Sequence, residues 1–403
     1  MSEPIYLSAR EAAAELGVQP ATLYAYVSRG IIRSVKGPGK QRRYDASDVR
    51  TLLANKSEDA GSAATGISQG ERVLETRLTL ISQEVGPVYR GRPARDLART
   101  SSLEAVATLL WDCDSDPFAQ DAPGGAPVLP NGLSAIDRLT MALAAWPLQD
   151  RAALTLSGKL LPKKGALLLR YGLSALLGGQ PATDPIHMQL SGAWGVATGH
   201  ADVVRAALVL CADHELNTSA FAVRCAASTR APLHAALLSG LGAFSGPRHG
   251  AAPDRVAAWL SDIKTPEDAH RTLAGRLARG ETLPGFGHRI YRDRDPRADR
   301  LLAIIGEVAP DNAVVRALPA LIETAEDLYG LAPNIDFALT VLQKAYDLPP
   351  DAAKILFCSG RMVGWIAHAL EQYGSPDQIR PRAAYVGARP RSSGQTWICS
   401  SSM

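Results

Sequence analysis

The sequence has few cysteines, few aromatic residues and no long apolar run, and each shortage excludes a class of protein. Five cysteines lie apart at positions 113, 211, 225, 358 and 399 without a Cys-x-x-Cys pair, which excludes a disulfide scaffold and the common zinc sites. No apolar segment approaches the ~20 residues of a membrane-spanning helix. The first residues lack the basic stretch and apolar core of a signal peptide. We therefore expect a cytoplasmic protein with no bound metal and no membrane contact.

Alanine and leucine are abundant instead. With 403 residues, of which 46% are hydrophobic and 21% charged, the chain has the composition of a folded protein with two or three domains. Aromatic residues make up only 6%, and this balance favours helices over strands.

Excess positive charge is confined to the beginning of the chain. Residues 1–54 contain eight Lys or Arg and five Asp or Glu, a net charge of +3, which equals the net charge of the whole chain. The rest of the sequence is therefore neutral overall. A basic region that is this localised indicates a separate N-terminal domain with its own partner.

The pattern of residues 6–32 predicts two short helices joined by a turn. Ser8 can cap the first helix with Glu11, Gly17 ends it, and Pro20 suits the first turn of the second. Their shared core would consist of Ala12, Leu16, Leu23 and Val27. This spacing is typical of a helix-turn-helix motif.

A glycine-bearing basic hairpin, KGPGKQRRY, and a third helix capped at Asp45 or Ser47 would follow. Together with AAAELGVQPATLYAYVSRGII, these pieces resemble the winged helix of MerR-like and excisionase-like DNA-binding domains. The resemblance implies that residues 1–54 bind DNA through groove-facing Gln19, Thr22 and Tyr26 and phosphate-contacting Lys40, Arg42 and Arg43. The alternative is a small helical docking domain with solvated charges.

The remainder is predicted to be mainly α, after a linker at 55–72. Residues 351–373 carry an apolar stripe between the start signal Pro349–Asp351 and the stop signal at Gly374. Similar patterns predict helices at 103–111, 133–146, 201–212, 219–229, 232–244, 253–263, 266–279, 297–307, 313–330 and 336–347. Residues 115–132, rich in Pro and Gly, should form a surface loop. Convincing strands are lacking.

Histidine, arginine and glycine concentrate in the second half. His288 follows Gly-Phe-Gly, where backbone N–H groups can approach a ligand closely. Arg292, Arg294, Arg297 and Arg300 follow within 12 residues, a density that calls for an anion. His249 precedes a predicted helix, whose N-terminus would keep the ring neutral and able to donate to an oxyanion. Asp336 has apolar neighbours that can raise its pKa and make it a base. These residue types suit proton removal next to a carbonyl and addition of the enolate to an anionic electrophile.

Six strings occur in the order and spacing found in the citrate synthase family: HELN, GPRHG, GFGHRIYRDRDPR, PNIDF, GRMVGWIAHALEQ and IRPRAAYVG. They cover roughly 200–388, and 88–111 resembles the family's N-terminal YRG segment, whereas 112–195 matches poorly. The resemblance implies a condensation of acetyl-CoA with oxaloacetate, followed by hydrolysis of citryl-CoA to citrate and CoA.

The resemblance also implies roles for particular residues. The thioester carbonyl would be polarised by His249, the methyl proton removed by Asp336, and the oxaloacetate carbonyl bound by His288. The substrate carboxylates would be held by His214, Asn217, Arg297 and Arg361, with Arg380 reaching into the neighbouring subunit. CoA, a co-substrate rather than a permanent cofactor, would contact Leu283, Pro284, Gly285, Phe286, Gly287 and Arg292.

By the same resemblance, the fold is mainly α, a two-domain helical citrate synthase-like fold after a winged helix-turn-helix domain. The large domain would comprise 73–249 and 348–390, and the small domain 250–347. We expect a homodimer or a dimer of dimers that works in a bacterial tricarboxylic acid cycle.

Two alternative functions stay open. Phe337 stands where many family members have tyrosine, which could favour propionyl-CoA and a 2-methylcitrate synthase. The basic N-terminal domain could instead make the chain a DNA-binding regulator with a citrate synthase-like sensor body.

Overall fold

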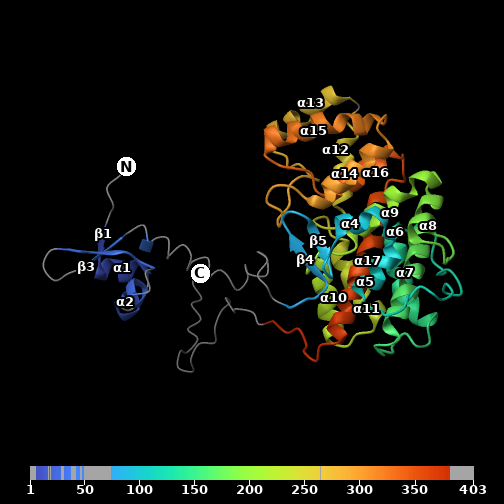
Figure 1. Cartoon of the computed structure of the whole chain (residues 1–403), viewed down its shortest axis with the longest axis horizontal. Helices are drawn as coiled ribbons and strands as arrows, with labels where there is room; N and C mark the ends of the chain where they lie inside the picture. Colours follow the sequence, from blue (N-terminus) through green and yellow to red (C-terminus); the bar gives the residue numbers. More distant parts are fainter. Residues whose placement is uncertain are drawn as a thin grey trace, which may run out of the picture. The chain divides into compact units, whose positions relative to one another are not determined.

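The structure, a computed structural model, describes residues 6–16, 18, 20–28, 31–37, 42–45, 48–49, 74–263 and 265–381. The chain divides into two compact units (Figure 1). The N-terminal unit consists of residues 1–75 with 380–403, and the body is Thr76–Ile379. The expected linker at 55–72 lies outside the described residues.

The N-terminal unit combines two helices with a small antiparallel sheet. Its elements are β1 (Tyr6–Ser8), α1 (Ala9–Leu16), α2 (Pro20–Ser28), β2 (Ser34–Lys36) and β3 (Arg42–Asp45), with β3 paired to both other strands. The capping box is confirmed, because Ser8 N donates to the Glu11 carboxylate at 2.7 Å and Glu11 N donates to the Ser8 hydroxyl at 3.3 Å. The two helices are therefore as expected, and β2 and β3 pair as the two strands of the expected hairpin, whose residues 38–41 lie outside the described residues.

The core of this unit also agrees with the sequence pattern. Ala12, Leu16 and Leu23 are buried, and Val27 packs against them. Arg33 pairs with Asp48 at 2.8 Å and with Asp45 at 3.1 Å. Residues 48–49 are helical, and the rest of the expected third helix lies outside the described residues.

The body is almost entirely helical, as expected. Its helices are α4 (Ala94–Thr100), α5 (Leu103–Leu110), α6 (Ala135–Ala145), α7 (Leu161–Leu177), α8 (Ile186–Ala193), α9 (Ala201–Cys211), α10 (Thr218–Ser228), α11 (Leu233–Phe244), α12 (Ala252–Leu260), α13 (Pro266–Ala278), α14 (Pro296–Val308), α15 (Ala313–Tyr329), α16 (Ile335–Ala345) and α17 (Ala352–Tyr373). Every helix that the sequence predicts in the body is present. Helices α4, α7 and α8 are additional, and α7 and α8 lie in the stretch 112–195.

A small sheet precedes the helices, so the expectation that the body lacks strands is wrong. Strands β4 (Thr79–Ser82), β5 (Gly86–Tyr89) and β6 (Arg92–Pro93) pair antiparallel in that order. Gly86 and Gly91 turn the chain between them with φ of 77° and 82°, a region that favours glycine. Strands of two to four residues are too short to show an alternating apolar pattern.

Helix α17 is the central element of the body (Figure 1). It packs against α5, α7, α9, α10, α11 and α16. Ile355, Met362 and Ile366 of the predicted apolar stripe are buried, and so are polar residues on other sides of the helix, among them Arg361 and His368. A helix surrounded in this way can hold polar side chains only where they find partners inside the protein.

Helices α12–α16 gather at one end of the body, drawn from yellow to orange in Figure 1. Within this group α13 packs on α15, and α16 packs on α12, α14 and α15. The group corresponds to the predicted small domain at 250–347, whose boundaries stay a prediction. Residues 112–134, which include the expected surface loop, form no helix or strand. Within the described residues, no helix combines the length and apolar character needed to cross a membrane.

We predict that Gly360→Ala destabilises the body because α17 and α9 touch at this glycine. A Cβ there would lie 2.6 Å from the Leu208 carbonyl oxygen, a backbone atom that cannot rotate away. The expected loss is about 1–3 kcal/mol of unfolding free energy. Gly242→Ala is the control, because Gly242 lies on α11 with open space around it and should be neutral or gain up to about 1 kcal/mol. Thermal melts of both variants test this, and equal melting temperatures would contradict the close contact.

Candidate active site

Three histidines, an aspartate and two arginines from different elements meet inside the body. His214 follows α9, His249 lies between α11 and α12, and His288 lies in the loop before α14. The rings of His214 and His288 are 5.3 Å apart. The others, Arg297, Asp336 and Arg361, come from the first turns of α14 and α16 and from the middle of α17. The structure therefore brings together six residues that the sequence singled out.

Arg297 is buried and forms a two-point ion pair with Asp295. Its Nε and Nη2 donate to the two Asp295 carboxylate oxygens at 2.9 and 2.8 Å. Asp295 also caps α14 and accepts from Ile335 N at 3.1 Å, so the same carboxylate ties the start of α14 to the start of α16. Sequence reasoning missed Asp295, although an Asp directly before Pro296 is an N-cap signal.

Asp336 has the properties of a base that works near neutral pH. Burial raises its pKa to about 7, although Arg297 and Arg361 favour the charged form. Its Oδ1 has no hydrogen-bond partner within the described residues. Asn334, the N-cap of α16, accepts from Asp336 N and donates to the Gly287 carbonyl, which fixes the helix start against the 283–287 loop.

His288 is a neutral donor. Burial and the nearby Arg297 charge lower its pKa to about 4. Its Nδ1 accepts from the backbone N–H groups of Ile290 and Tyr291, so the ring hydrogen must sit on Nε2. Nε2 lies 3.4 Å from Arg297 Nη2, and two donors this close together call for an anion that accepts from both.

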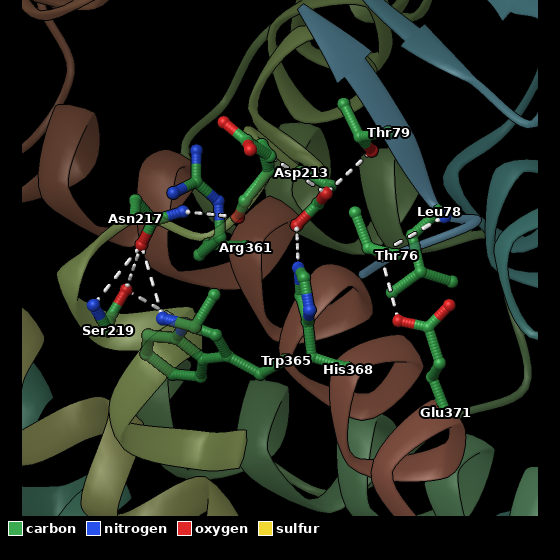
Figure 2. A network of polar contacts seen from close by, with 12 residues as sticks. Thr76, Leu78, Thr79, Asp213, Asn217, Ser219, Arg361, Trp365, His368 and Glu371 are labelled. Carbon is green, nitrogen blue, oxygen red and sulfur yellow. Dashed lines mark hydrogen bonds and ion pairs between the residues drawn. The ribbon is translucent and has the colours of Figure 1, made fainter. Parts of the chain in front are cut away.

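His249 belongs to a chain of hydrogen bonds through Ser219. Trp365 Nε1 donates to the Ser219 hydroxyl at 3.0 Å, so the single Ser219 hydrogen goes either to Asn217 Oδ1 at 2.7 Å or to His249 Nε2 at 2.8 Å. In the second arrangement the neutral His249 ring carries its hydrogen on Nδ1. Burial and then Arg361 lower its pKa to about 4, so burial rather than the helix start explains the neutral state. Figure 2 shows Asn217, Ser219 and Trp365 around this hydroxyl.

Arg361 has donors to spare. Its Nε donates to the Cys211 carbonyl at 3.0 Å and its guanidinium lies over the Phe357 ring, 4.9 Å from the centroid. Nη2 is buried and has no hydrogen-bond partner in the part of the chain that the structure describes. A buried guanidinium with a free donor is unusual and indicates a site for an anionic ligand.

His214 contacts Tyr291, which sequence reasoning also missed. The Tyr291 hydroxyl lies 3.0 Å from His214 Nε2, and Arg297 lies over the Tyr291 ring. Burial, followed by the charge of Arg297, lowers the pKa of His214 well below its usual value, so this ring is neutral too. Tyr291 and Trp365 lie within two of the matched strings and Ser219 lies two residues after HELN, but nothing in the sequence sets them apart as site residues.

The residues expected to bind CoA form a tight loop at the edge of the α12–α16 group. Gly285 and Gly287 have φ of 89° and 75°, and Trp259 Nε1 donates to the Pro284 carbonyl at 3.2 Å. Leu283 and Phe286 are buried, and the Phe286 ring packs on Phe337 and Trp259. Arg292 is exposed nearby, and its backbone N–H donates to Gln83.

Other predicted site residues lie outside this constellation. Arg380 is exposed, and its guanidinium donates to the Pro381 carbonyl at 3.0 Å. In the N-terminal unit Thr22 is exposed on α2, with Tyr26 half-buried on the same helix. On β3, Arg42 is exposed and Arg43 half-buried. Gln19 and Lys40 lie outside the described residues.

Comparison with known proteins agrees with these observations. The model of the citrate synthase C-terminal domain matches residues 172–382, and a helix-turn-helix domain model matches residues 6–57. The chain is 32% identical over 360 residues to citrate synthase of Haloferax volcanii, covering 80% of this chain and 95% of that protein. It is 29% identical over 382 residues to 2-methylcitrate synthase of Mycobacterium tuberculosis, covering 85% and 97%.

A solved structure shares the fold. It is the ternary complex of carboxymethyl coenzyme A and oxaloacetate with citrate synthase from Thermoplasma acidophilum, which superimposes with a TM-score of 0.70 at 23% identity over 83% of this chain and 98% of that one. The buried charges and neutral histidines thus occur on a shared fold, within a chain whose sequence matches over most of its length. This chain belongs to the citrate synthase family, with a helix-turn-helix domain at its N-terminus.

Proposed function

We propose that this chain condenses acetyl-CoA with oxaloacetate and hydrolyses the resulting citryl-CoA to citrate and CoA. The observation that carries the proposal is the meeting of Asp336, whose pKa is near 7, with neutral histidine donors and buried arginines. A base of this strength, donors for an enolate and guanidinium groups for a dicarboxylate are the parts that the reaction requires.

Asp336 removes the methyl proton of the thioester, and the enolate oxygen receives a hydrogen bond from His249 Nδ1. This requires the Ser219 hydroxyl to point to His249 Nε2. Asn217 Oδ1 then gives up the hydrogen bond from the Ser219 hydroxyl, but it still accepts hydrogen bonds from Ser219 N and Ala220 N, both at 3.2 Å. One such donor lowers the barrier by about 3–4 kcal/mol.

The enolate carbon then attacks the carbonyl carbon of oxaloacetate. His288 donates from Nε2 to that carbonyl and protonates the alkoxide as it forms. The substrate carboxylates pair with the guanidinium groups of Arg297 and Arg361, and with His214 after its hydroxyl partner Tyr291 turns aside; Asn217 stands next to them. Water then hydrolyses the thioester of citryl-CoA and releases CoA, which makes the overall reaction effectively irreversible.

CoA binding is proposed at the backbone of 283–287 and at the exposed guanidinium of Arg292. The acyl preference is a matter for measurement. Phe337 is fully buried and stacks on Trp259, so its ring lies in the core of the α12–α16 group rather than in the site. The replacement of tyrosine by Phe337 therefore gives little support for propionyl-CoA. We accordingly keep acetyl-CoA as the first substrate and 2-methylcitrate synthesis as the alternative.

We also propose a homodimer in which Arg380 reaches the partner's site, and a cytoplasmic role in the tricarboxylic acid cycle. The exposure of Arg380 is compatible with a contact across subunits.

DNA binding by the N-terminal unit is a second proposed function. It is supported by the match to a helix-turn-helix domain, by the net charge of +3 in residues 1–54 and by the exposed Arg42 on β3.

We predict that Asp336→Asn lowers the turnover number by at least about 10²–10⁴-fold, because the amide cannot accept the methyl proton. Oxaloacetate should still bind within about threefold, since the arginines remain. Turnover is followed by CoA thiol release, and oxaloacetate binding by calorimetry. Asp327→Asn, an exposed aspartate on α15, is the matched control and should be fully active. Near-normal turnover of Asp336→Asn would show that another group is the base.

We predict that kcat/KM rises with pH through about 7 and then levels off. A raised pKa means that Asp336 is still protonated below this pH, and only its ionised form is a base. His249 and His288, with pKa values of about 4, stay neutral over the same range and add no second step. Initial rates with acetyl-CoA between about pH 5.5 and 8.5 test this. A profile that is flat across the range would contradict the assignment.

We predict that the full-length protein binds duplex DNA with a log–log salt slope of about −2 to −3 per N-terminal unit, as two or three phosphate contacts would give. Arg42→Ala/Arg43→Ala should weaken binding in an anisotropy titration at low salt. The double variant Arg99→Ala/Arg316→Ala removes the same charge from exposed positions of the body and should not. Deleting residues 1–60 should leave synthase activity largely intact. Equal binding by both double variants, or none by the wild type, would favour a docking domain.

A further inference from the structure

Asp213 and His368 form a buried carboxylate–histidine pair that the proposed chemistry does not use. Both side chains are fully buried, and His368 Nε2 lies 3.2 Å from Asp213 Oδ1. Asp213 precedes His214 in the chain, and His368 lies on α17, two turns beyond Arg361. Figure 2 shows the pair between Arg361 on one side and Thr79 on the other. Burying two such groups costs free energy, so their retention calls for a reason.

The Asp213 carboxylate is held as an anion by several donors. Thr79 Oγ1 on β4 donates to its Oδ2 at 2.6 Å, and Glu215 N donates to the same oxygen at 3.2 Å. Burial alone would raise its pKa, but His368, Arg361 and Thr79 outweigh burial and lower it. Tyr89 on β5 fixes the backbone of the same residue, because its hydroxyl contacts both Asp213 N and Asp213 O.

One face of helix α17 contacts each residue of the segment 211–213. Arg361 Nε donates to the Cys211 carbonyl, Gly364 N donates to the Ala212 carbonyl at 3.0 Å, and His368 pairs with Asp213. Residues 361, 364 and 368 are spaced by three and four, so they share a face of the helix. A Cβ on Gly364 would collide with Ala212 O and Asp213 Oδ1, so the approach is close enough to require glycine. The segment that ends in His214 is thus registered against the helix that carries Arg361.

We propose that Asp213 and His368 are positioning residues that set His214 and Arg361 at the spacing needed for the oxaloacetate carboxylates. This inference rests on the proposed function and deepens it. It says that two residues which do not touch the substrate determine how well His214 and Arg361 fit the oxaloacetate carboxylates. Arg361 has one backbone acceptor and a free Nη2, so its orientation depends on the segment that carries Cys211. Asp213 is also the carboxylate whose charge does most to keep the buried guanidinium protonated.

The same helix face continues away from the site and supplies a matched control. Glu371, three residues beyond His368, accepts from Thr76 Oγ1 at 2.8 Å and from Arg77 N at 2.7 Å. Thr76 and Thr79 therefore make the same kind of contact, a hydroxyl donated to a carboxylate next to α17 (Figure 2). Thr79 donates to Asp213 of the pair, whereas Thr76 donates to Glu371, which is not part of the pair.

The test compares Thr79→Val with Thr76→Val in the full-length protein. Valine keeps the shape and removes the hydroxyl. Thr79→Val should raise the KM and the calorimetric Kd for oxaloacetate about three- to tenfold, because only part of the free energy of a hydrogen bond to a charged group is lost from substrate binding when the bond lies behind the site. The KM for acetyl-CoA should change less than about twofold, because no hydrogen bond joins the described residues 283–287 to the segment 211–213. Thr76→Val should leave every constant within about twofold.

The pair itself is tested with Asp213→Asn, His368→Gln and the double variant. Each single change should weaken oxaloacetate binding about tenfold or more, and the double variant should be little worse than either, because the two residues act as a unit. If the pair had only a structural role, these variants would melt at a lower temperature, but the folded protein would bind oxaloacetate with an unchanged Kd. That result, or equal effects of Thr79→Val and Thr76→Val, would overturn the proposal.

Calorimetry separates this inference from the proposed function. If the wild type binds oxaloacetate but does not turn over, the synthase proposal fails and the positioning proposal is still decided by Kd. If the wild type turns over and Thr79→Val binds oxaloacetate normally, the synthase proposal stands and the positioning proposal fails.

Discussion

Two arginine side chains, Arg297 and Arg361, are buried inside a helical body, and much of the site follows from how their charges are compensated. Moving such a charge out of water costs several kcal/mol unless partners replace the water. Arg297 has a full partner in Asp295, whereas Arg361 has a backbone carbonyl and a free donor. The neutral histidines beside them follow from the same constraint, because burial next to fixed positive charge keeps each ring unprotonated. A dianionic substrate would supply the missing compensation.

Helix starts place two of the site residues, Arg297 and Asp336, and a third helix start holds the contact of His249. Asn217, Asp295 and Asn334 cap α10, α14 and α16, and each cap also reaches a residue of the site. Asp295 pairs with Arg297, and Asn334 orients the turn that carries Asp336. First turns offer unpaired backbone donors and a defined geometry, so a few capping residues fix several functional side chains at once.

The sequence predicted the helices well where they are long and periodic, as α17 shows, and it predicted the six residues that meet in the site. It missed β4–β6, because strands this short carry no period, and α7, whose apolar residues surround the helix rather than form a stripe. It also missed Ser219, Tyr291, Asp295 and the Asp213–His368 pair. Their importance comes from contacts between distant segments, such as Thr79 with Asp213, and a single sequence does not contain that proximity.

The central claim is that the buried charges, the neutral histidines and Asp336 form a working condensing site rather than a sensor pocket. The most direct measurement incubates the full-length protein with oxaloacetate and acetyl-CoA and quantifies free CoA thiol and citrate together. We expect equal amounts of both products, formed over many turnovers and only when both substrates are present. Tight binding of oxaloacetate without release of CoA from acetyl-CoA or propionyl-CoA would contradict the account and favour a DNA-binding regulator that senses a metabolite.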